Sequence, residues 1–168
     1  AGHGIVSSIK DFYWDVRPKP EYGTVELRVL DTPLRPAYAA ALASYARELC
    51  IEAHARPGCW PADSSRELYA WNRFNAARDG VEGIWIDPET GDRRTVAQVV
   101  ENDLQRLAAS STDPGFGTAC KVIRELMARG GQARWLTSHM DAGSGVNDIA
   151  RVASELFFVG RWLYAGGQ

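Results

Sequence analysis

The sequence predicts an α+β fold that occupies residues 1–168 as a single domain. Short runs in which apolar and polar residues alternate indicate strands, and longer runs in which apolar residues recur every three or four positions indicate helices. A chain of 168 residues is long enough to bury roughly 70% of the surface that its unfolded form exposes. We therefore expect antiparallel strands backed by several helices.

The first two strands are expected at residues 11–17 and 24–30, as an antiparallel hairpin. The segment Pro18-Lys-Pro-Glu-Tyr-Gly23 separates them. Its prolines cannot donate ladder hydrogen bonds and its glycine favours a turn, so we expect the first strand to end before Pro18. In the second strand Val25 and Leu27 alternate with polar residues, and this apolar face is expected to pack on a core.

The hairpin register decides which polar side chains share a face. If Arg17 lies opposite Thr24, then Asp15 lies opposite Glu26, and two carboxylates face each other. Like charges directly opposite are destabilising, so this pair requires a cation, a nearby arginine or a raised pKa. A register that differs by one residue moves Asp15 and Arg17 to the other face, and this alternative stays open.

A smaller hairpin is expected over residues 83–95, with its turn at Asp87-Pro-Glu-Thr-Gly91. Helices are expected in the rest of the chain, between breaks rich in glycine, proline and serine. Thr32 is the expected cap of the first helix, with Pro33 or Pro36 in its first turn. Gly130-Gly131 is expected to close the fourth helix in a left-handed turn. The expected helices run from Thr32-Pro33 to about His54, Ser64 to Asp79, Thr95 to Ala109, Thr118 to Arg129, residues 132–140, and Ser144 or Asn147 to Leu163.

Composition excludes several classes of protein. The 19 basic and 21 acidic residues leave a net charge of -2, so we expect neither a nucleic acid nor a membrane as partner. Three cysteines without Cys-x-x-Cys spacing predict reduced thiols, and three scattered histidines disfavour a zinc site. The sequence has no phosphate-loop, dinucleotide-binding or nucleophile-elbow motif. We expect a cytoplasmic protein that acts on small molecules.

The polar residues of the first hairpin form the candidate site. Glu26 and Arg28 stand two positions apart, about 6.8 Å along a strand, which suits a metal ligand beside an anion-binding group. In the second helix Asn72 and Arg73 are adjacent, and we expect their donor-rich side chains to leave the helix together. A solvated strand face and an exposed helix surface are the alternative interpretations.

The segment Asp11-Phe-Tyr-Trp-Asp-Val-Arg-Pro-Lys-Pro-Glu-Tyr-Gly-Thr-Val-Glu-Leu-Arg-Val-Leu-Asp-Thr-Pro33 resembles the signature of the bacterial carboxylate-amine ligases, also called type 2 glutamate-cysteine ligases. The resemblance continues through Asn72-Arg-Phe-Asn-Ala-Ala-Arg-Asp-Gly80 and Ile86-Asp-Pro. It implies a glutamine-synthetase-like catalytic fold, in which an antiparallel sheet forms a funnel. An Arg-x-Glu-x-Arg strand of that superfamily binds metal and phosphate. Glu26 and Arg28 match its last two positions, whereas Thr24 replaces the first arginine.

The resemblance implies that ATP and Mg²⁺ serve as cofactors and that γ-glutamylcysteine forms through an acyl phosphate, a step of glutathione biosynthesis. It implies Arg28 and Arg17 as catalytic residues that bind phosphate or a substrate carboxylate, and Glu26 as the metal ligand. Asp15, Asn72 and Arg73 are the further residues that we expect to bind substrate or cofactor.

This chain is much shorter than members of that family, and it lacks their acidic Gly-Val-Glu-Glu-Glu-type strand. We therefore expect it to be the C-terminal part of a larger ligase catalytic domain, inactive alone, without the N-terminal acidic metal-binding part. Its expected partners are that missing part or a second copy of the chain. The alternative is a non-catalytic interaction domain that retains the ligase scaffold.

Overall fold

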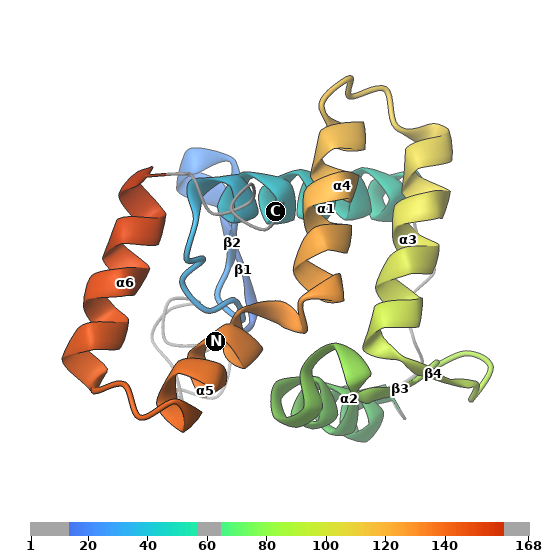
Figure 1. The fold of residues 1–168 in the computed structure, drawn as a ribbon. Coiled ribbons are helices and arrows are strands. Elements are labelled where there is room, and N and C mark those ends of the chain that lie inside the picture. The colour runs from blue at the N-terminus through green and yellow to red at the C-terminus, as the bar shows by residue number, and fades with distance from the viewer. Residues whose placement is uncertain (1–13, 57–64, 160–168) are drawn as a thin grey trace, which may run out of the picture. The chain divides into compact units, whose positions relative to one another are not determined.

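The computed structural model describes residues 14–56 and 65–159. The chain divides into two compact units, one that ends at Pro33 and one that begins at Leu34. Both contain antiparallel strands, and the second also contains α-helices (Figure 1). The α+β class predicted from the sequence is therefore confirmed.

The first unit contains a hairpin of β1 (Val16–Lys19) and β2 (Thr24–Leu27), antiparallel as predicted. Both strands are shorter than expected, and residues 11–13 lie outside the described residues. A short 3-10 helix, Pro20–Tyr22, makes the turn and ends at Gly23. Gly23 has a φ of 62°, a left-handed conformation that glycine adopts without steric cost.

The ladder pairs Arg17 with Glu26, which corrects the predicted register. Asp15, which we expected opposite Glu26, lies instead across from Arg28: the Arg28 N–H donates to the Asp15 carbonyl at 2.7 Å. The shift is two residues, so the same side chains still share one face. Acid faces base across the hairpin, and the pair of opposed carboxylates does not form.

Pro18 lies inside β1, where the sequence predicted a turn. Hydrogen-bonded and non-hydrogen-bonded pairs alternate along an antiparallel ladder. Since Asp15 and Arg28 are joined by a backbone hydrogen bond, Pro18 and Val25 form a pair of the other kind. The nitrogen of Pro18 therefore points away from β2, and its missing N–H removes no bond between the two strands.

The second unit holds six α-helices and a small hairpin among its described residues (Figure 1). The helices lie close to the predicted positions, and the hairpin is antiparallel as expected. The predicted end of the last helix, Leu163, lies outside the described residues. The elements are α1 (Pro36–Ala55), α2 (Ser65–Asp79), a 3-10 turn (Gly80–Glu82), β3 (Ile84–Ile86), β4 (Arg93–Thr95), α3 (Val96–Ser110), α4 (Phe116–Ala128), α5 (Gly131–Asp141) and α6 (Val146–Val159).

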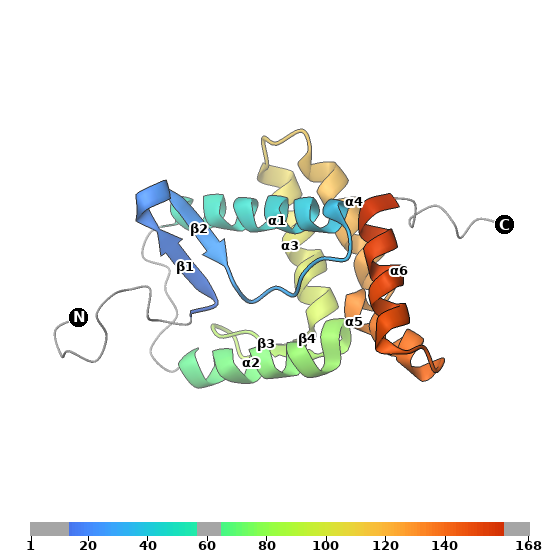
Figure 2. The same cartoon turned by 90° about the vertical axis from the view of Figure 1, so that its left-hand side faces the viewer.

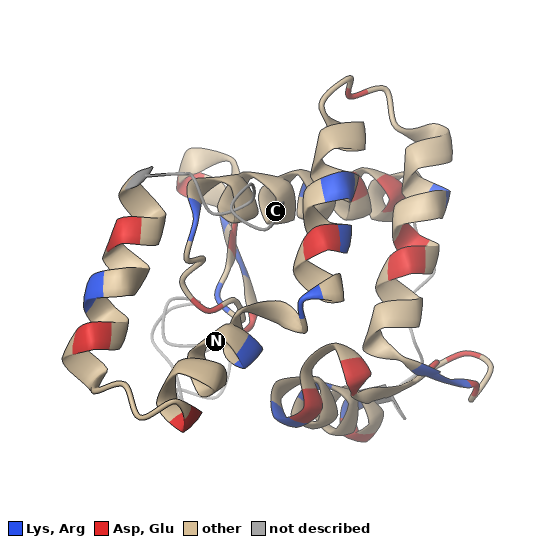
Figure 3. Ribbon diagram, in the orientation of Figure 1, with Lys and Arg blue, Asp and Glu red and all other residues tan. Residues whose placement is uncertain are grey.

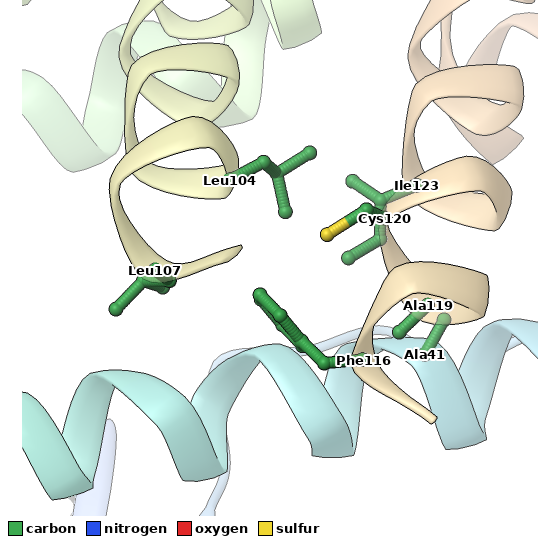
Figure 4. Close-up of a cluster of buried hydrophobic side chains, with 7 residues drawn as sticks. All are labelled: Ala41, Leu104, Leu107, Phe116, Ala119, Cys120 and Ile123. Atoms are coloured by element: carbon green, nitrogen blue, oxygen red, sulfur yellow. The ribbon is translucent and has the colours of Figure 1, made fainter. Parts of the chain in front are cut away.

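The core of the second unit lies where α1 packs across the pair α3 and α4 (Figures 1 and 2). Its buried side chains recur every three or four residues on α3 and α4, as expected for one face of a helix. They are Ala41, Leu104, Leu107, Phe116, Ala119, Cys120 and Ile123 (Figure 4). Burial raises the pKa of the Cys120 thiol, so this cysteine acts as a small apolar side chain.

The start of α1 agrees with the prediction in its proline and differs in its cap. Pro36, one of the two prolines expected there, occupies the first turn, whereas Arg35 rather than Thr32 stands at the cap position, without a side-chain capping bond. Proline suits the first helical position because an N–H there has no partner within the helix. The N–H of Leu34 donates to the side-chain oxygen of Gln132 on α5, 98 residues away. This tertiary contact holds the chain just before the helix.

Local side-chain bonds shape the second hairpin and the start of α3. In the turn, one oxygen of Asp87 accepts the N–H of Glu89 at 2.9 Å and that of Thr90 at 3.1 Å. These two bonds lower the pKa of the Asp87 carboxyl. Thr95 then caps α3 by accepting the N–H of Gln98, whose side chain accepts the N–H of Thr95. This is a complete capping box.

Charged residues of both signs are interspersed along the helices of the second unit (Figure 3). Two ion pairs join one helix to another: Glu101 of α3 pairs with Arg124 of α4, at 2.8 Å, and Glu52 of α1 pairs with Arg106 of α3. Both pairs connect helices that share the core. None of the helices in the described ranges has the length and apolar character that crossing a lipid bilayer requires.

Candidate functional site

The polar face of the hairpin gathers three cations around one carboxylate, Glu26. Arg17 donates from Nε at 2.9 Å and from Nη2 at 2.6 Å to Oε2 of Glu26. The Lys19 Nζ lies 3.8 Å from the same oxygen, and the Arg28 Nε lies 3.8 Å from Oε1. We call these four side chains the Glu26 cluster. Its positive charges outnumber its negative charge by three to one.

The sequence predicted three members of this cluster and missed the fourth. Arg17, Glu26 and Arg28 were predicted site residues, and the hairpin brings them together on one face. Asp15 shares that face by its place in the ladder, opposite Arg28. Lys19 was not predicted, because Pro18-Lys19 was interpreted as part of the turn. Alternation from Arg17 to Lys19 in an extended chain is the signal that would have found it.

Electrostatics keep Glu26 ionised. The hydrogen bonds from Arg17 are the largest cause of a pKa below the ordinary value of 4.5. Burial opposes the shift, and the charges of Arg17, Lys19 and Arg28 add to it. The Arg17 side chain is only 13% exposed and the Glu26 side chain 39%, so the arginine is the more firmly enclosed partner. At neutral pH the cluster therefore presents one anion and three cations.

We expect an NMR titration of the Glu26 side-chain carboxyl to give a midpoint below 4.5. A depressed folded-state pKa means that the ion pair stabilises the hairpin above the unfolded-state pKa, and that this contribution is lost as pH falls through the folded value. Arg17→Gln should move the midpoint upward because it removes the guanidinium. Arg151→Gln, which breaks the exposed pair with Glu155 on α6, is the control and should leave it unchanged. A midpoint at or above 4.5 in the unaltered chain contradicts this account.

The Glu26 cluster suits a phosphate or carboxylate ligand accompanied by a metal ion. Guanidinium groups bind such anions through paired N–H donors. Mg²⁺ commonly takes one or two protein carboxylates and completes its coordination with substrate phosphates and water. Within the described ranges, no group of three or more His, Cys, Asp or Glu side chains is placed to hold a metal. One carboxylate among cations therefore fits a magnesium–phosphate complex better than a metal held by protein ligands alone.

Asn72 and Arg73 do not leave α2 together, which corrects that expectation. Asn72 is 2% exposed, whereas Arg73 is exposed. The Asn72 Nδ2 donates to the carbonyl of Ile86 and its Oδ1 accepts the N–H of Ile86, both at 2.8 Å. Asn72 therefore joins α2 to the end of β3. A ligand-binding role for Asn72 or Arg73 stays a prediction.

Asn72→Ala is expected to lower the free energy of unfolding by about 2 to 4 kcal/mol, because it leaves two backbone groups of Ile86 without partners. Urea denaturation followed by circular dichroism measures the loss. Asn102→Ala, which removes an exposed amide on α3, is the matched control. If the two variants lost the same free energy of unfolding, the hydrogen bonds from Asn72 to Ile86 would not contribute to stability.

Comparison with known proteins identifies the family to which this chain belongs. The chain matches the family model described as glutamate-cysteine ligase family 2 (GCS2) over residues 1–153. The chain belongs to this family.

Three curated bacterial relatives are similar to the chain, and each is provisionally named glutamate-cysteine ligase 2. The relative from Verminephrobacter eiseniae is 37% identical over 155 residues, which are 92% of this chain and 41% of the relative. The relative from a Janthinobacterium species is 38% identical over 155 residues, 92% of this chain and 42% of the relative. The relative from Methylibium petroleiphilum is 40% identical over 139 residues, which are 83% of this chain and 38% of the relative. The chain thus spans about two fifths of the length of these relatives.

Proposed function

We propose that this chain contributes part of the catalytic unit of an ATP-dependent carboxylate-amine ligase that joins glutamate to cysteine. Membership of the glutamate-cysteine ligase family 2 supports the ligase class. The observation that carries the proposal is the Glu26 cluster, which combines a candidate metal ligand with three cations. A cytoplasmic location and small-molecule substrates accompany this proposal.

In the proposed reaction the side-chain carboxylate of glutamate attacks the γ-phosphorus of ATP, and the bond to the ADP oxygen breaks. The amine of cysteine then attacks the resulting acyl phosphate, loses a proton, and phosphate leaves as γ-glutamylcysteine forms. Negative charge must be stabilised on the transferred phosphoryl oxygens during the first step. This requirement explains why a ligase would place several cations on one rigid strand face.

Each residue of the Glu26 cluster has a proposed role. Arg28 binds phosphate, and Arg17 binds phosphate or the substrate carboxylate as a bidentate donor. Glu26 binds Mg²⁺, and when bound the ion would offset charge on the phosphates. Lys19 adds a further positive charge on the same face. Asp15 is proposed to orient substrate or a water molecule of the metal.

The test joins this chain to the part of the Verminephrobacter relative that the match leaves uncovered. ADP release is then measured with ATP, Mg²⁺, glutamate and cysteine, and again with each amino acid omitted. We expect release that depends on both amino acids. A folded hybrid without such release, under conditions in which the intact relative turns over, would refute the proposal.

A further inference from the structure

A cavity of about 250 Å³ lies within the second unit, between the start of α1, the end of α4 and α5. Its walls include the apolar side chains Leu34, Leu126 and Trp135. The charged residues among its lining are Arg129 and Arg134, and no acidic residue lines it in the described part of the chain. Mostly apolar walls with a few polar groups are typical of small-molecule sites, although this cavity is somewhat smaller than their usual volume of about 300 to 1,000 Å³.

Tyr38 lines the same cavity and is 1% exposed. Its hydroxyl is buried and has no hydrogen-bond partner among residues 14–56 and 65–159. Buried hydroxyls almost always have one, because an unsatisfied group retains its full desolvation penalty. A ligand oxygen that reaches this hydroxyl would supply the missing partner.

Positive charge is concentrated at the start of α5. A Cβ on Gly130 would come within 2.4 Å of the Arg134 Cδ, so the absence of a side chain there lets the arginine stem lie across the helix start. The helix has no side-chain cap, and its first N–H groups add partial positive charge. Arg35 lies next to the Tyr38 ring, and burial lowers the pKa of its guanidinium. Tyr38 opposes this shift of the pKa, and the positive charge of Arg129 adds to it.

From the cavity, the buried hydroxyl and the two arginines, we infer that this cavity is a binding site for a small organic anion. A carboxylate or phosphate head group binds Arg129, Arg134 and the first N–H groups of α5. An oxygen of the ligand accepts a hydrogen bond from the Tyr38 hydroxyl. A short apolar body fills the space beside Leu126 and Trp135. The site shares no residue with the Glu26 cluster and does not depend on its proposed function.

Calorimetric titration of the 168-residue chain with inorganic phosphate and with butyrate tests this site. Arg134→Gln should weaken binding about tenfold because it removes a charged donor. Arg151→Gln, an exposed arginine paired with Glu155 on α6, is the matched control and should bind as the unaltered chain does. Binding of phosphate alone or of butyrate alone supports the site and identifies its head group only where Arg134→Gln weakens that binding; binding that Arg134→Gln leaves unchanged belongs to the Glu26 cluster and counts against the site.

The variant Tyr38→Phe tests whether the Tyr38 hydroxyl binds ligand or stabilises the fold. Without ligand, the variant should melt at the same temperature as the unaltered chain or higher, because a buried unsatisfied group is removed. With ligand, it should bind about tenfold more weakly. The proposal is overturned if neither phosphate nor butyrate binds at millimolar concentration, or if Arg134→Gln and Tyr38→Phe both bind the probes as the unaltered chain does. It is also overturned if Tyr38→Phe lowers the melting temperature of the unliganded chain.

Discussion

Glu26→Gln is expected to lower ADP release at least about 100-fold in the hybrid ligase proposed above, while the free energy of unfolding changes little. A neutral amide binds Mg²⁺ poorly and no longer offsets the charge of the surrounding cations. The carboxylate lies on a partly exposed strand face, where ion pairs contribute little to stability. Steady-state kinetics and urea denaturation of the same preparations measure the two effects.

Glu155→Gln is the matched control for this substitution. Glu155 is also an exposed glutamate that pairs with an arginine, Arg151, at 2.7 Å, but it lies on α6 and is far from the Glu26 cluster in sequence. This variant should keep full turnover. If Glu26→Gln retained turnover within a few-fold of the unaltered hybrid, Glu26 would not be the metal ligand, although the ligase proposal itself would stand.

Phe116→Ala is expected to destabilise the second unit by about 3 to 5 kcal/mol. Phe116 is 1% exposed and lies in the cluster formed by α1, α3 and α4 (Figure 4). Its removal costs the burial of an aromatic ring and leaves a cavity that neighbouring side chains fill only in part. Such a loss is a large share of the 5 to 15 kcal/mol typical of folded domains.

Phe158→Ala provides the comparison, since Phe158 is 83% exposed at the end of α6. Its substitution should change the free energy of unfolding by less than about 0.5 kcal/mol. Urea denaturation followed by circular dichroism compares the two variants. Similar losses in both would mean that the core does not lie at the junction of α1, α3 and α4.

The helices were predictable because their signals are local. Leu104 and Leu107 follow the helical period, Thr95 and Gln98 form a capping box within four residues, and Gly130 has the left-handed conformation expected after α4. Each signal depends on residues that are neighbours in the chain. Such patterns indicate a helix and its ends before any tertiary contact is known.

The errors concern features that depend on distant contacts or on one backbone conformation. The register of β1 and β2 follows from a turn built by a 3-10 helix and Gly23, which residue types alone do not specify. The bonds from Asn72 to Ile86 and from Leu34 to Gln132 join segments that no periodicity relates. The expectation that the side chains of Asn72 and Arg73 leave the helix together was wrong because the Asn72 amide bonds to the backbone of Ile86.

The candidate site was predictable in composition but not in pairing. The spacing of Glu26 and Arg28 on an alternating strand correctly placed them on one face. That Arg17, rather than Asp15, faces Glu26 depends on the register, and so the expected repulsion between acids is replaced by attraction. The roles of these residues in binding or catalysis are still predictions.

Pro18 makes the two outer edges of the first hairpin chemically unequal. On β1 the backbone nitrogen of Pro18 faces away from β2 and carries no hydrogen. On β2 the nitrogens of Val25 and Leu27 face away from β1, and each carries a hydrogen that can be donated. A strand from another molecule that paired with β1 would lack one hydrogen bond at Pro18. Proline on an edge strand is one of the devices by which proteins prevent such pairing. Intermolecular sheet growth is thus disfavoured on one side of the hairpin, and only β2 presents an uninterrupted row of donors.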